Sequence, residues 1–172
     1  MDEPVKLRLF EDAMLPHLRA AHNLARWIVK SPQDAEDLVQ EAYIKAFRYF
    51  DGFQGGNSQA WLLAIVRNTC LTWLRDSRTG LSSVVSFDEH IHRTGEHVRN
   101  VEEALVVESD IGSLRDCIEG LPVEYRETVV MRELEGMSYK EIAKTMSVPA
   151  GTIMSRLSRG RKRLEDCMGS RA

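Results

Sequence analysis

The chain has 172 residues, of which 43% are hydrophobic and 28% are charged. This composition is typical of a folded globular protein, excludes an intrinsically disordered one, and allows one domain or two small ones. No apolar run approaches the roughly 18 to 20 residues that cross a bilayer, and the N-terminus lacks the basic start and apolar centre of a signal peptide. We therefore expect a cytoplasmic protein.

Charge is segregated along the chain, so the net charge of −3 is a poor guide to the protein's partners. Residues 31–56 carry a net −3 and residues 81–110 a net −5, whereas residues 57–80 carry +2 and residues 151–172 carry +4. A polyanion such as nucleic acid can bind at the two basic segments, while the two acidic segments repel it.

The three cysteines, Cys70, Cys117 and Cys167, are far apart and form no C-x-x-C pair. This spacing predicts neither a disulfide framework nor a zinc site, and it fits a reducing compartment. We expect Cys70 and Cys117 to be small buried side chains.

No sequence motif of a catalytic or cofactor site is present, since the chain has no nucleophile elbow, phosphate loop or H-E-x-x-H pattern. His90, His92 and His97 lie near Glu89 and Glu96 in a polar segment. Such a cluster can ligate a metal or sense pH, but a solvated linker is the simpler interpretation. We expect no enzyme activity, no cofactor and no metal.

The first half of the chain predicts three helices. Apolar residues recur every three or four positions over residues 7–28, which indicates one amphipathic helix. Ser31 is a predicted N-cap and Pro32 a first helical residue, so a second helix should run to about Phe50. A third is expected over residues 58–76, and the three helices together can bury one small core.

The second half is also predicted to be helical, after a linker. Helical periodicity is lost over residues 77–110, where glycine and serine mix with acids, and residues 81–110 are the predicted linker. A transient helix over residues 98–107 is the alternative for part of it. Helical periodicity returns at Ile111, and a break at Gly120 separates that helix from another that starts at Pro122. No strand-like alternation lasts long enough to propose a sheet.

The C-terminal segment predicts a helix-turn-helix. Ser138 and Glu141 have the spacing of a capping box that starts a short helix, and Pro149 follows the break after it. The next helix, residues 150–166, is strongly basic, as a helix that enters the major groove should be. A helical hairpin with a solvated basic face is the alternative.

Two separate stretches resemble one family. Residues 121–161, which include LEGMSYKEIA and GTIMSRLSRGR, look like region four of a bacterial extracytoplasmic-function (ECF) sigma factor. Residues 34–43 (DAEDLVQEAY) and 60–69 (AWLLAIVRNT) look like region two of the same family. The resemblance implies an all-α fold with two small helical domains joined by a flexible linker: 1–80 as region two, 81–110 as the linker and 111–172 as region four.

In that family, region two docks on a coiled coil of the clamp of the polymerase's largest subunit. The acidic and polar face of the second helix suits such a charged partner. The core-binding residues that the resemblance implies are Asp34, Asp37, Leu38, Gln40 and Glu41.

The following loop and helix would recognise the melted minus-ten element of a promoter, which needs stacking surfaces and basic groups together. Its glycines allow the backbone to approach an extruded base. The residues implied are Phe53, Asn57, Trp61, Arg67, Asn68 and Arg75. Core packing is favoured over base stacking for Trp61 and Trp73, whereas Asn68 beside Arg67 is the stronger candidate for base contact.

Region four would bind the minus-thirty-five element as duplex. We assign base contacts to Ser155 and Arg159, and phosphate contacts to Arg156, Arg161 and Lys162. Thr152 completes the implied set. Met154 departs from the arginine that some members carry there, so promoter preference does not transfer.

The resemblance therefore implies a non-enzymatic, monomeric subunit that binds core RNA polymerase, directs promoter-specific initiation, and is held inactive by an anti-sigma factor. The acidic segments would keep its affinity for DNA low when it is alone. The competing hypothesis is a self-sufficient helix-turn-helix regulator, which would bind two half-sites as a symmetric dimer. A helical enzyme or scaffold is a third.

Overall fold

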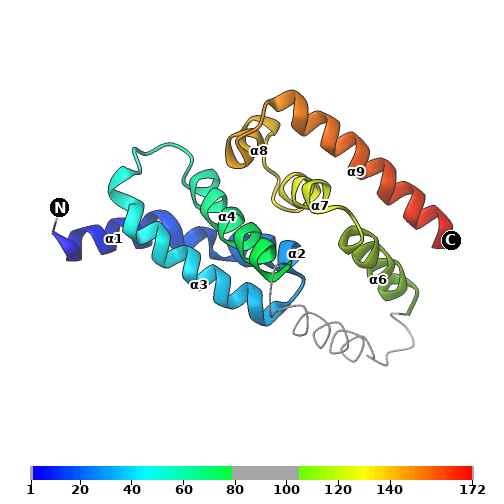
Figure 1. The fold of residues 1–172 in the computed structure, drawn as a ribbon, viewed down its shortest axis with the longest axis horizontal. Coiled ribbons are helices and arrows are strands. Elements are labelled where there is room, and N and C mark those ends of the chain that lie inside the picture. Colours follow the sequence, from blue (N-terminus) through cyan, green and yellow to red (C-terminus); the bar gives the residue numbers. More distant parts are fainter. Residues whose placement is uncertain (1, 79–104, 172) are drawn as a thin grey trace.

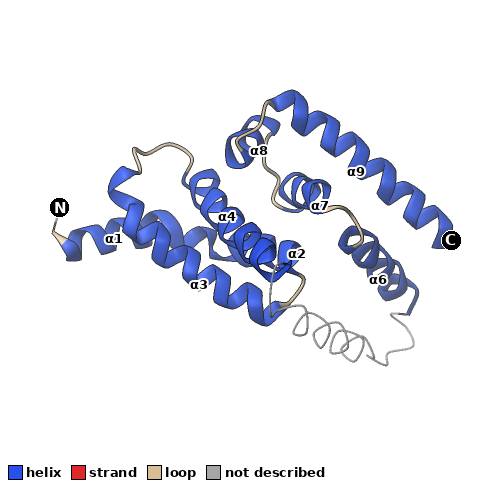
Figure 2. Ribbon diagram, in the orientation of Figure 1, coloured by secondary structure: helices blue, strands red, loops and turns tan. Residues whose placement is uncertain are grey.

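The computed structural model describes residues 2–78 and 105–171, and these residues form helices without any strand, as Figure 2 shows. Helices α1 to α4 form an N-terminal domain and helices α6 to α9 a C-terminal domain, with α7 and α8 facing the N-terminal domain (Figure 1). The predicted all-α fold with two helical domains is confirmed.

The first predicted helix is interrupted. The structure has α1 (Glu3–Met14), a 3-10 turn η1 (Leu15–His17) and α2 (Leu18–Val29) in place of one helix over residues 7–28. Pro16 explains the difference, because it has no backbone N–H to donate and its ring clashes with the carbonyl four residues earlier. The prediction of a single helix was wrong, although its periodicity was helical on both sides of the break.

The next two helices are as predicted. α3 (Pro32–Tyr49) begins after Ser31, whose hydroxyl accepts a hydrogen bond from the backbone N–H of Asp34 at 3.3 Å. A short 3-10 turn, η2 (Phe50–Gly52), and a loop lead to α4 (Ser58–Arg78). The inner stripe of α3 is buried throughout: Ala35, Leu38, Val39, Ala42 and Ala46.

Helix α4 is enclosed on more sides than its sequence period suggests. Trp61, Ile65 and Trp73 are partly buried and pack against the core, whereas Leu63 and Cys70 are fully buried. The reason is that α4 packs against α2 and α3 of its own domain and also against α8 of the other. Burial raises the pKa of the Cys70 thiol to about 12, so this cysteine is an unreactive core residue.

The C-terminal domain begins with α6 (Leu105–Glu119), which starts inside the segment predicted as a linker. The rest of that segment, with the histidine cluster, lies outside the described residues. Then follow α7 (Val123–Val129), a π-helical turn η3 (Val130–Leu134), α8 (Tyr139–Met146) and α9 (Ala150–Arg171).

The helix-turn-helix is built as the sequence predicts. Ser138 accepts from the backbone N–H of Glu141 at 3.1 Å, and Glu141 accepts from the backbone N–H of Ser138 at 2.9 Å. Ser147 ends α8 in the left-handed conformation, with φ 55°. Helix α9 then crosses α7 closely at Gly160, where an added Cβ would lie 2.9 Å from Cγ2 of Val129.

The expectation that the cysteines are unpaired was wrong for two of them. Cys117 of α6 and Cys167 of α9 form a disulfide that links residues 50 positions apart. The pairing was invisible in the sequence because it depends on α6 packing against α9 (Figure 1), and their Cα atoms lie 5.9 Å apart. The disulfide therefore links the C-terminal end of α6 to the last turns of α9.

Reduction of this disulfide should lower the stability of the C-terminal domain. A closed loop of 50 residues restricts the unfolded chain enough to contribute about 2–4 kcal/mol. We expect thiol reductant to lower the thermal midpoint of the wild-type protein, measured by circular dichroism. The Cys117→Ala variant should melt at the same temperature with and without reductant. Equal midpoints for the oxidised and reduced wild type would contradict this.

Candidate polymerase and nucleic-acid interfaces

The outer face of α3 presents the predicted polymerase contacts with one exception. Asp37, Gln40 and Glu41 are exposed, and Glu41 pairs with Lys45 one turn later at 2.8 Å. Leu38 is only 4% exposed, so its side chain supports α3 from the core and cannot contact a partner in this conformation. Leu38 is therefore withdrawn from the predicted contact surface.

Asp34 occupies an intermediate position at the first turn of α3. Its carboxylate lies at the N-terminal, positive end of the helix dipole, where a negative charge is stabilised. Its Oδ2 atom is buried and has no hydrogen-bond partner. Asp34 thus lies at the edge of the acidic face and not at its centre.

The predicted stacking residues of the minus-ten surface belong to an aromatic cluster. The rings of Phe53 and Trp61 lie 5.1 Å apart, and Phe53 stacks on Phe50 at 5.8 Å. Phe50 is buried, while Phe53 and Trp61 are partly exposed. The cluster fixes the loop before α4 to the core, which agrees with the preference for core packing by Trp61.

Asn57 has a structural role that the sequence did not reveal. Its Oδ1 accepts from the backbone N–H of Ala60 at 2.9 Å, which is the hydrogen bond of an N-cap, and α4 starts at the next residue. Gly55 and Gly56 precede it with φ values of 83° and 88°, in the left-handed region that suits glycine. Asn68 lies on the exposed side of α4.

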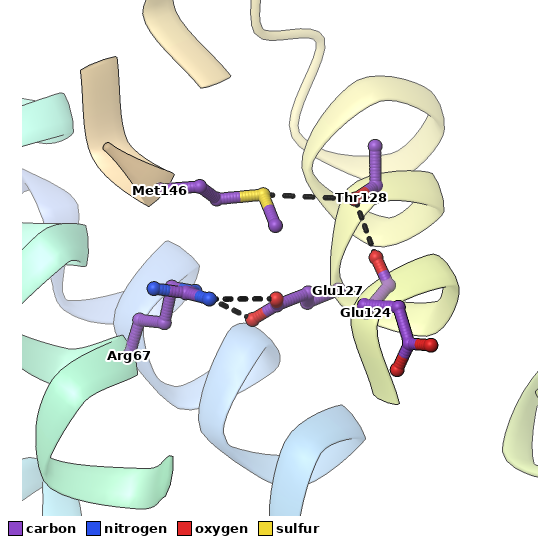
Figure 3. Close-up of polar contacts among 5 residues, drawn as sticks. All are labelled: Arg67, Glu124, Glu127, Thr128 and Met146. Atoms are coloured by element: carbon purple, nitrogen blue, oxygen red, sulfur yellow. Dashed lines mark hydrogen bonds and ion pairs between the residues drawn. The ribbon is translucent and has the colours of Figure 1, made fainter. Parts of the chain in front are cut away.

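Arg67 contacts the other domain. Its Nε and NH2 groups donate to the two carboxylate oxygens of Glu127 in α7, at 2.7 Å and 3.0 Å (Figure 3). Glu127 is 1% exposed. Burial raises the pKa of the Glu127 carboxyl, and the hydrogen bonds from Arg67 oppose that rise.

Arg126, beside Glu127, is a second interdomain contact that sequence reasoning missed. Its guanidinium donates to the backbone carbonyls of Trp27 and Ile28, at 2.6 Å and 3.0 Å, in the last turn of α2. Carbonyls at a helix C-terminus have no partner within the helix, so the arginine satisfies groups that would otherwise need water. Arg126 belongs to the stretch that resembles region four, but its spacing alone gives no sign of an interdomain role.

Four of the predicted DNA contacts lie close together on the N-terminal half of α9. Thr152, Ser155, Arg156 and Arg159 line one surface depression with residues of α7. Ser155 and Arg159 are exposed, and the Ser155 hydroxyl donates to the backbone carbonyl of Gly151 at 3.1 Å. Met154, on the same helix, is 55% exposed.

Arg161 and Lys162, the predicted phosphate contacts farther along α9, are paired with acids at the surface. Arg161 Nε donates to Glu133 at 2.9 Å, and Lys162 lies 3.7 Å from Asp166. All four side chains are about half exposed or more. Exposed pairs of this kind are weak, so phosphates can compete for both cations.

Both domains match models of known families. Residues 14–79 match sigma-70 region 2, and residues 111–164 match sigma-70 region 4. An ECF RNA polymerase sigma-E factor from Haemophilus influenzae is 33% identical over 154 residues, which cover 86% of this chain and 80% of that protein. The chain belongs to the ECF sigma factor family.

Other comparisons agree with this ECF sigma assignment. The ECF RNA polymerase sigma factor SigE of Mycolicibacterium smegmatis is 34% identical over 91% of this chain, and the match spans 60% of that longer protein. Among solved structures, the fold resembles the sigma factor RpoE of Bartonella quintana, in complex with the anti-sigma factor NepR. The TM-score is 0.70 at 24% identity, with coverage of 93% of this chain and 96% of the other.

A second solved structure has a similar fold over both domains. CnrH, in complex with the cytosolic domain of CnrY, covers 96% of this chain and 91% of its own, with a TM-score of 0.67 at 22% identity.

Among the described residues, no helix combines the length and apolar character that crossing a bilayer requires. Nor do residues 2–78 and 105–171 hold a metal-binding group of three or more His, Cys, Asp or Glu side chains.

Asn57 and Asn68 should differ in their effect on stability. Asn57→Ala removes the cap of α4 and should cost about 1 kcal/mol of unfolding free energy. Asn68→Ala removes an exposed side chain and should change it by less than about 0.5 kcal/mol. Urea unfolding followed by tryptophan fluorescence measures both. Equal stability of the two variants would contradict the capping role.

Proposed function

We propose that this protein is a dissociable specificity subunit of bacterial RNA polymerase, which binds the core enzyme and directs promoter-specific initiation without catalysing a reaction itself. The observation that carries the proposal is the combination of surfaces in one chain. One domain matches region 2 and has the acidic helix α3 followed by α4; the other matches region 4 and has a basic helix-turn-helix. A protein that acts on core polymerase works in the cytoplasm.

Core binding is assigned to the exposed acids of α3. Asp37, Gln40 and Glu41 form a polar face that DNA phosphates repel and that a basic helical partner attracts. Asp34 contributes from the edge of this face.

Promoter binding is divided between the domains. Asn68 and Arg75 lie exposed on α4 to meet the melted minus-ten strand, with Phe53 and Trp61 as partly exposed stacking surfaces. On α9, Ser155 and Arg159 face outward to meet base edges of the minus-thirty-five duplex. The phosphate contacts are assigned to Arg156, Arg161 and Lys162, with Thr152 beside them.

An anti-sigma factor is the proposed inhibitor, because the similar structure of the sigma factor RpoE of Bartonella quintana is a complex with the anti-sigma factor NepR. A groove spans both domains and is lined by the exposed side chains of Leu15, Leu18 and Leu134, with Arg19 and Arg26 along its wall. An amphipathic helix with an acidic flank fits this combination of leucines and arginines. Because Leu134 belongs to the C-terminal domain and the other four residues to the N-terminal one, such a helix would hold the two domains together.

Transcription from fragmented genomic DNA tests the proposed function. Purified protein added to core polymerase should yield new transcript starts that share two upstream elements at a fixed spacing. Core alone is the reference sample. The charge-reversal variant Asp37→Lys/Glu41→Lys should lose these starts and co-elution with core, because it repels a basic partner.

A matched reversal, Glu11→Lys on the exposed side of α1, should keep both activities. No new starts with folded wild-type protein and active core would contradict the proposal. A symmetric dimer that binds duplex promoter DNA tightly without polymerase would instead support the stand-alone regulator.

A further inference from the structure

The loop of residues 51–57, which joins α3 to α4, is contacted by α1 at its first residue. Nζ of Lys6 in α1 lies 3.0 Å from Oδ2 of Asp51, although the two residues are 45 positions apart in the sequence. Figure 1 shows the start of α1 beside the end of α3, where this loop begins. The N-terminal helix is therefore joined to a loop that carries two of the proposed minus-ten contacts, Phe53 and Asn57.

Lys6 is held more firmly than an ordinary surface lysine. Its side chain is only 14% exposed, and its ammonium group lies 4.8 Å from the centroid of the Phe47 ring. An exposed ion pair is weak because water competes for both charges. Here the aromatic face and the carboxylate of Asp51 replace much of that water, so the ammonium group has a defined position.

A second residue of α1 supports the same loop. Phe10 lies one turn after Lys6 on the same face of the helix, and it is buried. Its ring packs edge-on against the ring of Phe50 at 5.4 Å, and Phe50 stacks on Phe53 at 5.8 Å. Helix α1 thus supports an aromatic residue of the loop as well as the carboxylate at its start.

The middle of the loop has few neighbours of its own. A Cβ added at Gly52, Gly55 or Gly56 would meet no heavy atom of the described residues within 4 Å. Glycine-rich backbone without close packing can adopt many conformations. The contacts at the start of the loop therefore determine where its middle lies, and a pocket that selects one base needs a fixed position.

The ion pair also neutralises a charge that opposes DNA binding. The Asp51 side chain is 64% exposed, and an unpaired carboxylate at this place would repel the phosphates of a bound strand. Lys6 compensates that charge. Removal of either partner frees the loop, but only removal of Lys6 leaves an uncompensated negative charge beside it.

We propose that Lys6 is a positioning residue for minus-ten recognition, which acts through Asp51 to fix the loop of residues 51–57 in the conformation that accepts one base of the melted strand. The inference rests on the proposed function, since it assigns base selection to that loop. The base preference of the protein then depends on a residue of α1 that lies outside the proposed DNA contacts.

Two variants that break the pair from opposite sides test this role. Transcription with core polymerase from a library randomised over the minus-ten element should show that Lys6→Met and Asp51→Asn each lower the base preference at the same position by at least ~3-fold. Affinity for the strand should fall in Lys6→Met and not in Asp51→Asn, because only the first leaves an unpaired carboxylate. Lys6→Arg keeps the cation and should restore the preference.

Arg8→Met and Asp12→Asn are the matched controls, because they make the same charge changes at exposed positions of α1. Both should keep the wild-type base preference. If Lys6→Met and Asp51→Asn change affinity in opposite directions and leave every base preference intact, charge alone explains them and the positioning role is overturned.

Amide exchange in the free protein tests the loop without polymerase. The backbone N–H of Phe53 donates to the carbonyl of Phe50 at 2.9 Å. This amide should exchange at least ~3-fold faster in Lys6→Met and Asp51→Asn, while the amide of Ala35 in α3 stays unchanged. An unchanged rate at Phe53 in both variants would also overturn the positioning role. If wild-type protein never initiates, the proposed function fails, while exchange at Phe53 still decides whether Lys6 holds the loop.

Discussion

A carboxylate that is 1% exposed has lost almost all of its water, and it stays ionised only if a cation replaces that water. Glu127 meets this requirement with a cation from another domain, 60 residues earlier in the chain. This ion pair acts together with the packing of α4 on α8 and of α2 on α7 to hold the two domains in one arrangement. In this arrangement Arg67 supplies the cation, with Arg126 and Arg156 nearby; if the domains separate, Glu127 regains water.

The neighbouring residues turn this single contact into a defined geometry. Arg126 and Glu127 are adjacent on α7, and they reach α2 and α4 respectively. The π turn that follows shifts the hydrogen bonding by one residue, with the N–H of Glu135 donating to the carbonyl of Val130 at 3.1 Å. That shift accompanies the contact between Glu135 and Asn23. One short segment therefore fixes the orientation of the helix-turn-helix against the N-terminal domain.

Local patterns in the sequence predicted what neighbouring residues determine. The capping box of Ser138 and the inner stripe of α3 depend on spacings of three and four residues, and both are present. Pro16 also indicated the break in the first helix, but the amphipathic periodicity on both sides of the proline favoured one continuous helix. The Cys117–Cys167 disulfide and the partners of Arg67 were not readable, because they depend on how helices far apart in sequence pack together. The burial of Leu38 shows the same limit within one motif.

The distance between the domains, free and on polymerase, tests the account most directly. Spin labels at Arg48→Cys on α3 and Lys144→Cys on α8 occupy exposed positions outside the proposed contacts. Double electron–electron resonance should give one narrow, short distance for the free protein and a longer one after core polymerase is added. A single unchanged distance in both samples, or a broad and long distribution in the free protein, would contradict two domains that are packed together in the free chain and that polymerase holds apart.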